Sequence, residues 1–365
     1  GDGDVVLLPE ESAEARLTQP LHSQSSLPST SQPKRWEFDR VYDGSATQEE
    51  VFAEVRPLAM AVLDGFSACV LAYGATGSGK THTMMGSVNS RGVNYRVLTE
   101  MMAIVAARKP AFSHHVRVSL VEVYNEQLMD LLAEGDPSAP KKALQLTHVG
   151  AEELHSTCHV PGAFTTIVHG VEDIIDVMTV GDCYRTFAAT QLNARSSRSH
   201  TVLSVSVEGT DTTSGAITLG RLHLVDLAGS ELIGTPPVAP AGGAEFLGRH
   251  GDRHAQIGAE RHALLAEEAR HINRSLQALA DVMGALLKET SPERTPYDRS
   301  MLTRLLRSSL SGESKVCMFT CIDPSRRRAC EAETVLQFAT QVKEVKTRAK
   351  QKRLPGTEPQ NFSAK

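Results

Sequence analysis

The sequence lacks the features that mark membrane, secreted and fibrous proteins. No uninterrupted apolar run reaches the roughly 20 residues of a membrane-spanning helix, and the acidic start Gly1-Asp2-Gly3-Asp4 lacks the basic n-region of a signal peptide. The six cysteines are scattered and form no Cys-x-x-Cys pair, which argues against a metal or redox motif. The sequence has no internal repeat and no heptad run long enough for a coiled coil. We therefore expect a soluble intracellular protein.

A surplus of basic charge is also missing. The 365 residues carry a net charge of −5 at pH 7, which argues against a protein whose whole surface binds nucleic acid, although a local basic patch does not show in the total. With 41% hydrophobic and 22% charged residues, the composition is that of a soluble globular chain. We expect neither a membrane nor a nucleic acid as a partner.

Composition divides the chain into an N-terminal arm, a large central domain and a short tail. Residues 9–34 are rich in Pro, Ser, Thr and Gln and lack hydrophobic periodicity, so we expect the arm, residues 1–35, to be partly disordered or irregular. The ordered domain is predicted over residues 36–347, followed by a basic tail at 348–365. Residues 233–258 contain three prolines and a Gly-Gly pair, which predicts a long surface loop inside the domain.

Short apolar runs alternate with helical patterns along the central domain. A helix is predicted from Gln48, with Thr47 as its N-cap and Gly65 at its end. Further predicted strands lie at 68–73, 116–123, 201–207, 221–226 and 315–322, and further helices at 171–183, 263–288, 301–310 and 330–345. This alternation predicts an α/β fold, a three-layer sandwich in which helices flank a central, mostly parallel sheet.

One loop has the pattern of a phosphate-binding site. The run Gly74-Ala75-Thr76-Gly77-Ser78-Gly79-Lys80-Thr81 follows a predicted buried strand and matches G-x-x-x-x-G-K-[ST]. In such a loop successive backbone N–H groups point inward, and a polyphosphate binds at the N-terminus of the next helix. We expect Lys80 to reach the β and γ phosphates and the Thr81 hydroxyl to bind Mg²⁺. The alternative is a Gly-rich turn that only joins a strand to a helix.

A second segment places a carboxylate at the end of an apolar strand. Asp226 closes the run Leu222 to Asp226, and Gly229 follows three residues later, which is the Walker-B arrangement. We expect Asp226 to hold the Mg²⁺ shell and the Gly229 amide to sense the γ-phosphate. An Asp after a strand is more often a cap or turn former when it stands alone. The phosphate-binding loop favours the magnesium role here.

A third segment, residues 193–200, makes a family resemblance specific. The run Asn193-Ala194-Arg195-Ser196-Ser197-Arg198-Ser199-His200 would by itself be interpreted as a solvated polar loop. Together with the two segments above, in this order and at this separation, it resembles switch I of the kinesin superfamily, beside that family's P-loop and switch II. Myosins share the P-loop and G proteins share the switches, but neither carries Ser-Ser-Arg-Ser-His followed by Asp-Leu-Ala-Gly-Ser-Glu. The resemblance covers about residues 36–347.

The resemblance implies that the chain binds and hydrolyses ATP with Mg²⁺. It implies that Mg²⁺ is held by Thr81, Ser197 and Asp226, and that Arg198 and Glu231 form a salt bridge over the γ-phosphate. Four further roles follow from it: phosphate or water contacts by Asn193 and Ser196, phosphate sensing by Gly229, and packing on the adenine by His82. For His82 the alternative is a histidine on a helix surface.

The resemblance also implies a partner and a location. The chain is expected to be a microtubule-binding motor domain that uses ATP hydrolysis to move along microtubules, in the cytoplasm and cytoskeleton. Any dimerisation would use segments outside this chain. One alternative is a kinesin-like structural protein fixed in a microtubule or ciliary assembly, with weak or no motility. Another is a P-loop GTPase or other nucleotide switch unrelated to tubulin.

Four departures from the kinesin pattern bear on these expectations. The usual first strand with its Arg-x-Arg-Pro segment has no counterpart before Trp36. Asp298 and Met301 stand where kinesins carry two cations that face the microtubule, so weaker track binding is expected. The loop at 233–258 is longer than in kinesins, and Leu232 replaces a common arginine.

Overall fold

The computed structural model describes residues 4–7, 34–133, 143–144, 160, 162–191, 197–230, 252–325 and 328–355. At 4–7, 143, 182, 184–191 and 252–265 only the backbone is described. Most of the predicted irregular segment 9–34, residues 233–251 of the predicted loop and residues 356–365 of the tail therefore lie outside the described residues.

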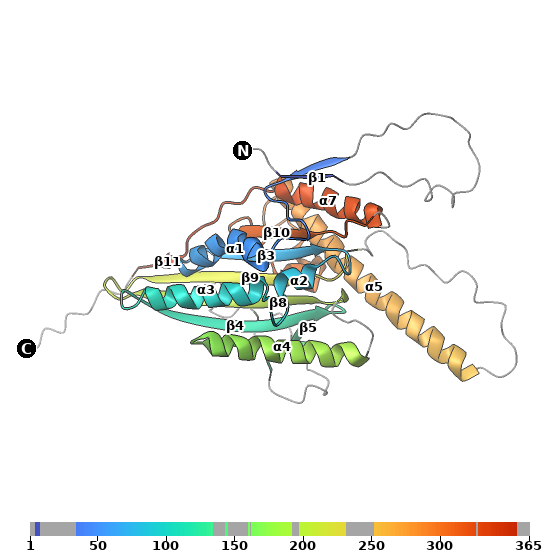
Figure 1. Cartoon of the computed structure of the whole chain (residues 1–365), viewed down its shortest axis with the longest axis horizontal. Coiled ribbons are helices and arrows are strands. Elements are labelled where there is room, and N and C mark those ends of the chain that lie inside the picture. The colour runs from blue at the N-terminus through green and yellow to red at the C-terminus, as the bar shows by residue number, and fades with distance from the viewer. Residues whose placement is uncertain are drawn as a thin grey trace, which may run out of the picture.

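A nine-stranded sheet forms the middle layer of the molecule (Figure 1). Its strand order is β10-β3-β9-β8-β4-β5-β6, with β7 paired to β4 and β11 paired to β9. The bounds are β3 Ser67–Gly74, β4 Phe112–Tyr124, β5 Gln127–Asp130, β6 Ala143–Leu144, β7 Thr166–Val168, β8 His200–Asp211, β9 Ile217–Asp226, β10 Lys315–Cys321 and β11 Arg353–Leu354. The five strands expected from the sequence correspond to β3, β4, β8, β9 and β10.

Parallel pairing is limited to the β10–β3–β9 part of this sheet. The other recorded pairs, including β9–β8, β8–β4 and β4–β5, are antiparallel. The sheet is therefore mixed, with less parallel pairing than expected. The reason lies in the connections: Asn125 and Glu126, with φ of 50° and 58°, make a two-residue turn between β4 and β5, and only residues 212–216 join β8 to β9. Strands joined so tightly pair antiparallel.

Helices cover both faces of the sheet, which confirms the three-layer α/β architecture (Figure 1). One face packs on α1 (Gln48–Leu63), α3 (Val93–Ala107) and α4 (Val171–Gln191), around a core that includes Val97 and Ile174. The other face packs on α5 (Asp252–Leu287), α6 (Met301–Leu305) and α7 (Ala329–Lys343), around Leu276 and Leu302. In the part of the chain that the structure describes, no helix combines the length and apolarity needed to cross a bilayer.

Helix boundaries follow the sequence at α1 and differ at α4, α5 and α6. The helix α4 continues to Gln191, beyond its predicted end at residue 183. Thr47 caps α1 through a capping box with Glu50, and Gly65, just after the helix, has a φ of 90°, so both predicted end signals are confirmed. The helix α5 begins at Asp252, inside the predicted loop. The sequence does not reveal this start, because a polar first turn has no hydrophobic stripe. The helix α6 ends at Leu305, earlier than predicted, and the apolar residues up to Leu310 are buried in turns.

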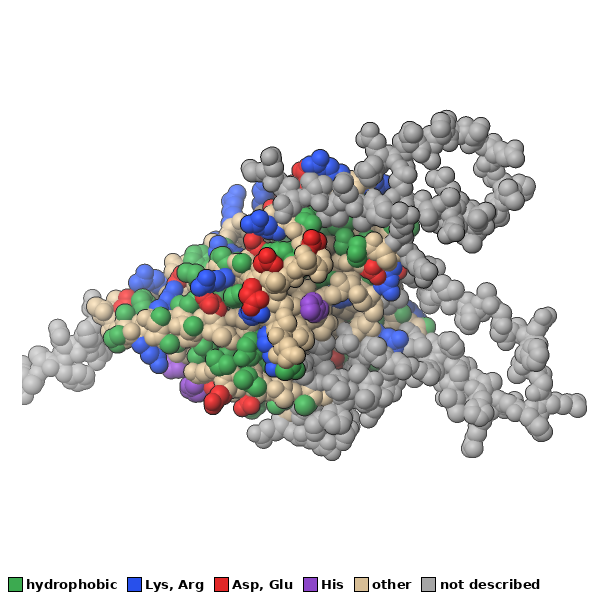
Figure 2. All heavy atoms as spheres, in the orientation of Figure 1, with side chains coloured by type: hydrophobic (Ala, Val, Ile, Leu, Met, Phe, Trp, Pro, Cys, Tyr) green, Lys and Arg blue, Asp and Glu red, His purple; other side chains and the backbone are tan. Residues whose placement is uncertain are grey.

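The two ends of the described chain both lie on this core. In the predicted arm, β1 (Asp4–Leu7) pairs antiparallel with β2 (Arg35–Phe38), and β2 packs on α7. After α7 the chain runs back along the sheet, where the Lys352 N–H donates to the Gly65 carbonyl at 2.9 Å and β11 pairs with β9. Figure 2 shows acidic, basic and apolar side chains interspersed over the described part of the face it presents.

Candidate functional site

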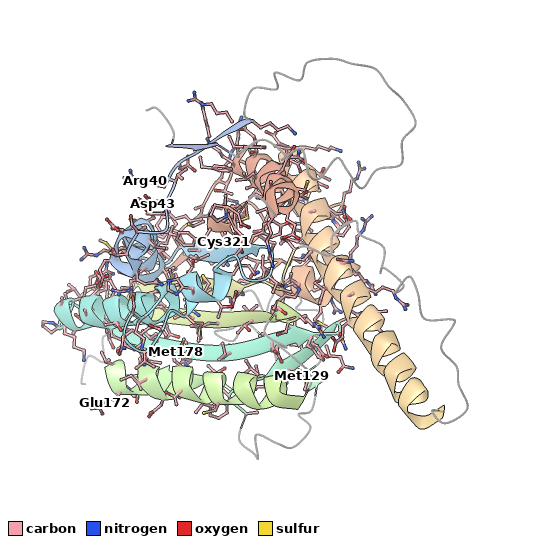
Figure 3. The ribbon with its side chains drawn as sticks, turned by 45° about the vertical axis from the view of Figure 1, so that its right-hand side comes forward. Arg40, Asp43, Met129, Glu172, Met178 and Cys321 are labelled. Carbon is pink, nitrogen blue, oxygen red and sulfur yellow. The ribbon has the colours of Figure 1, made fainter. Side chains whose placement is uncertain are left out.

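The phosphate-binding pattern lies where β3 ends and the short helix α2 (Lys80–Met84) begins. Gly77 and Gly79 have φ of 80° and 102°, and a Cβ built on either meets no heavy atom within 4 Å, so this side of the loop is open. At Gly74 a Cβ would lie 2.0 Å from the carbonyl oxygen of Cys321 at the end of β10. Only glycine therefore fits where the loop leaves the strand. Cys321 is labelled near the middle of the view in Figure 3.

The lysine of the loop is buried against it. Lys80 is 6% exposed, and its ammonium donates to the carbonyl oxygens of Gly74 at 2.9 Å and Ala75 at 2.7 Å. An ammonium is a compact charge on a flexible stem. Its position over the loop suits contact with a phosphate bound there.

Two oxygen ligands suitable for Mg²⁺ meet at the start of α2. The Thr81 hydroxyl donates to a carboxylate oxygen of Asp226 at 2.7 Å. The register of the parallel pair β3–β9, in which Ala72 lies opposite Asp226, brings the ends of both strands to the same edge of the sheet. Mg²⁺ is bound by hard oxygen ligands, often one or two protein oxygens together with phosphates. The hydroxyl and the carboxylate therefore fit a magnesium ion.

Ser197 and Gly229 are joined to each other, and the next residue is joined to the loop. The Gly229 N–H donates to the Ser197 carbonyl at 2.9 Å, and the Ser230 N–H donates to the Gly74 carbonyl at 3.0 Å. The structure thus brings together the three segments that the sequence singled out. Asn193, Ser196 and Glu231 lie outside the described residues.

Arg198 contacts a residue that the sequence did not identify as part of the site. Its guanidinium donates from Nη1 to Oε2 of Glu268 on α5 at 2.8 Å, and the Glu268 side chain is only 8% exposed. The Tyr124 hydroxyl also hydrogen-bonds Glu268. Nothing in the local sequence marked Glu268, because it lies in a long helix where a charged residue usually faces solvent.

A second arginine contacts the phosphate-binding loop from the far end of the chain. Arg328, which precedes α7, donates from Nη1 to the Thr76 carbonyl at 2.6 Å. Its guanidinium also lies 3.6 Å from Asp323 and 3.7 Å from Glu331, and it is 40% exposed. The contact arises because β10 runs parallel to β3, so the chain that leaves β10 passes beside the loop. This long-range contact has no local sequence signal.

His82 occupies an exposed position on α2, where its backbone carbonyl accepts a hydrogen bond from the Gln48 amide at 2.8 Å. Its ring is therefore accessible beside the phosphate-binding loop. The predicted contact with an adenine stays a prediction.

These contacts define the class of the protein: an α/β domain with a P-loop at the end of a central strand. Comparison with known proteins then makes the family specific. The kinesin motor domain family matches residues 9–238 and 251–345. The gap between these stretches, 239–250, falls inside the predicted loop at 233–258 and outside the described residues.

Curated relatives agree with this match. The chain is 40% identical over 313 residues to the kinesin-like protein KIN-14G of Arabidopsis thaliana, covering 85% of the chain and 28% of the relative. It is also 40% identical over 316 residues to the kinesin-like protein KIN-14F of Oryza sativa subsp. japonica, covering 86% of the chain and 28% of the relative. The chain thus spans less than a third of the length of these relatives.

Solved structures show the same likeness. A structure from a study of mutants and the activation of the kinesin motor ATPase superimposes with a TM-score of 0.66 at 30% identity, covering 86% of this chain and 84% of that one. The motor domain of the Kar3-like kinesin from Ashbya gossypii superimposes with a TM-score of 0.62 at 28% identity, covering 86% of both chains. The chain belongs to the kinesin motor domain family.

Proposed function

We propose that this chain is a microtubule-stimulated ATPase that hydrolyses ATP to ADP and phosphate and uses the reaction to move along microtubules. The observation that carries the proposal is the meeting of Thr81, Asp226, Ser197 and Gly229 around one P-loop. The ion pair between Arg198 and Glu268 connects these segments to the long helix α5. A nucleotide site is thereby connected to an element that can carry its state elsewhere in the molecule.

The proposed roles follow the chemistry of each group. The open side of the loop, residues 74–79, presents backbone N–H groups to the phosphates, and Lys80 neutralises the β and γ phosphates. Thr81, Ser197 and Asp226 hold Mg²⁺, which supplies charge stabilisation to the transferred phosphoryl group. Phosphoryl transfer is mostly positioning and electrostatic stabilisation, so no strong base is required.

The remaining residues act on the attacking water and on the release of phosphate. Asn193 and Ser196 position the water or contact the phosphates, and Arg198 with Glu231 orders the water above the γ-phosphate. Gly229 senses that phosphate through its amide. The exposed ring of His82 packs on the adenine.

Microtubules are the proposed partner and track, which places the chain at the cytoskeleton of the cytoplasm. The helix α5, at 36 residues, extends beyond the sheet (Figure 1) and carries the state of the nucleotide site toward the track. Because the microtubule surface is acidic, we expect binding to weaken as salt rises.

A steady-state ATPase assay with and without microtubules tests this function, and Arg198→Ala provides the matched variant. The proposal expects many-fold stimulation of the parent protein, a strong preference for ATP over GTP, and a loss of at least about tenfold in Arg198→Ala. Tight microtubule binding without stimulation or gliding would favour a fixed structural protein. Equal activity of Arg198→Ala and the parent with microtubules would contradict the role of Arg198.

A further inference from the structure

A buried histidine at the start of β8 joins the segment that follows β9 to the long helix α5. His200, the first residue of β8, is 2% exposed. Its Nδ1 accepts a hydrogen bond from the Ala228 N–H at 3.0 Å, and its Nε2 lies 2.7 Å from the Ser275 hydroxyl on α5. One ring thus contacts the backbone next to Gly229 on one side and the long helix on the other.

The chemistry of the partners determines the state of this ring. A backbone N–H can only donate, so the Nδ1 that accepts from Ala228 carries no proton. The ring hydrogen is therefore on Nε2 and donates to the Ser275 hydroxyl. The Ser275 hydroxyl in turn donates to the Ile272 carbonyl at 2.8 Å. Each donor has one acceptor, and the chain of hydrogen bonds runs in a single direction from Ala228 to α5.

Burial keeps the ring neutral, as this arrangement requires. Desolvation, with a smaller contribution from the charge of Lys80, lowers the pKa of His200 to about 3. A protonated ring would present an N–H to the Ala228 N–H, which would break the first hydrogen bond. The neutral ring is therefore maintained throughout the physiological pH range.

The position of the ring gives these bonds a consequence. Ala228 directly precedes Gly229, whose N–H donates to the Ser197 carbonyl. Ile272 and Leu276, on either side of Ser275, are buried in the core beneath α5. Apolar contacts are non-directional, whereas a hydrogen bond has a strict preferred length and angle. A shift of α5 along the sheet therefore changes the length and angle of the His200–Ser275 hydrogen bond. The apolar neighbours tolerate the same shift, because their contacts have no preferred direction.

We propose that His200 is a positioning residue that couples displacement of α5 to the backbone at Ala228 and Gly229. The inference rests on the proposed function, since the coupling acts on the hydrolysis that microtubules stimulate. His200 transmits position through neutral hydrogen bonds and takes no part in proton transfer.

Ser275→Ala tests the coupling because it removes the far end of the chain without touching the nucleotide site. A neutral hydrogen bond contributes about 1 kcal/mol, which corresponds to about fivefold. Microtubule-stimulated kcat should fall about fivefold, while the basal rate and the affinity for ADP stay within about twofold. The matched control is Ser204→Ala, a buried serine of β8 whose hydroxyl has no recorded hydrogen-bond partner; it should behave as the parent. Equal losses of basal and stimulated rate in Ser275→Ala would indicate a structural role and overturn the proposal.

Two further variants separate the two ends of the ring. In His200→Asn the amide oxygen takes the place of Nδ1 and accepts from Ala228, but the amide does not reach Ser275. Combining His200→Asn with Ser275→Ala should therefore lower the stimulated rate no further than either change alone. Fully additive losses would show that the two side chains act independently, against the proposal.

Hydrogen exchange tests the same link independently of ATPase activity. In the full chain, Ser275→Ala should speed exchange several-fold in the peptide that contains Ala228 and Gly229, and leave the β4–β5 hairpin unchanged. If the parent has no ATPase activity, the proposed function fails, and this measurement still decides the link. Unchanged exchange at Ala228, or faster exchange throughout the sheet, would overturn the inference.

Discussion

Arg198, two residues before β8, and Glu268 on the helix α5 form an ion pair 2.8 Å long. The family resemblance implies a different partner for this arginine, Glu231, which lies outside the described residues. The two contacts are compatible, because a guanidinium has five N–H donors and can bind two carboxylates. The pair with Glu268 therefore anchors the segment that contains Arg198 on α5.

Replacing Glu268 by alanine should destabilise the fold by about 1–3 kcal/mol, because Arg198 and the Tyr124 hydroxyl both lose a largely buried partner. Urea unfolding followed by circular dichroism would measure this change. The control is Glu267→Ala, one residue earlier, whose side chain is 62% exposed and should change stability by less than about 0.5 kcal/mol. Equal effects of the two variants would show that the ion pair contributes nothing.

Asp226→Asn should remove most of the dependence of nucleotide binding on Mg²⁺. The carboxylate that accepts from Thr81 becomes a neutral amide. Changing an outer-shell partner in a metal site already costs about 10–100-fold in metal affinity, so changing a proposed ligand should cost at least as much. Release of a fluorescent ADP analogue, with and without EDTA, would report it: EDTA should speed release from the parent far more than from the variant. Thr83→Ala, on the same short helix, should respond to EDTA as the parent does.

Arg328→Ala should weaken ADP binding about fivefold, because the Thr76 carbonyl of the phosphate-binding loop loses its guanidinium partner. The expected loss is modest since Arg328 is 40% exposed. Titration with the fluorescent ADP analogue gives the dissociation constant. Arg348→Ala, an exposed arginine of the C-terminal segment, should leave it unchanged. If both arginines proved dispensable, the contact with Thr76 would have no role in binding.

The sequence predicts local features well because they depend on neighbouring residues. The loop at Gly74–Thr81 requires a strand, glycines and a helix start within a few positions, and the Thr47 cap and its Glu50 partner lie three residues apart. The contact between Thr81 and Asp226 could also be predicted, because the resemblance relates two distant motifs that the register of β3 and β9 then brings together.

Contacts between distant elements are the least predictable feature of this sequence. Glu268 reaches Arg198 across 70 residues, and Arg328 reaches Thr76 across 252, so no local pattern connects either pair. The tautomer of His200 depends on a backbone N–H of another segment, which composition does not reveal. The sequence does not reveal the start of α5, whose first turns are polar, or the tight connections that make neighbouring strands antiparallel.

Stability should fall as pH drops from about 6.5, because two buried histidines stay neutral in the fold. Burial lowers the pKa of His200 and of His223 to about 3, whereas an unfolded histidine has a pKa of about 6.5. The unfolded chain then binds more protons than the native one between these values, so each histidine costs up to about 1.4 kcal/mol per pH unit. Urea midpoints at pH 7.5 and 5.5 would measure the loss, and His223→Gln should reduce it by about half. A midpoint independent of pH would contradict the prediction.

Asp298→Arg should strengthen microtubule binding. Asp298 is 67% exposed and pairs only loosely with Arg304, at 3.8 Å, so the change adds two units of positive charge where the kinesin pattern carries a cation. Against an acidic surface this should raise affinity about three- to tenfold at low salt, with the gain shrinking as ionic strength rises. Cosedimentation at two salt concentrations would measure it. The control is Glu172→Arg on α4, well away from α5 (Figure 3), which makes the same change in net charge. If both variants raised affinity equally, general attraction rather than this position would govern binding to the track.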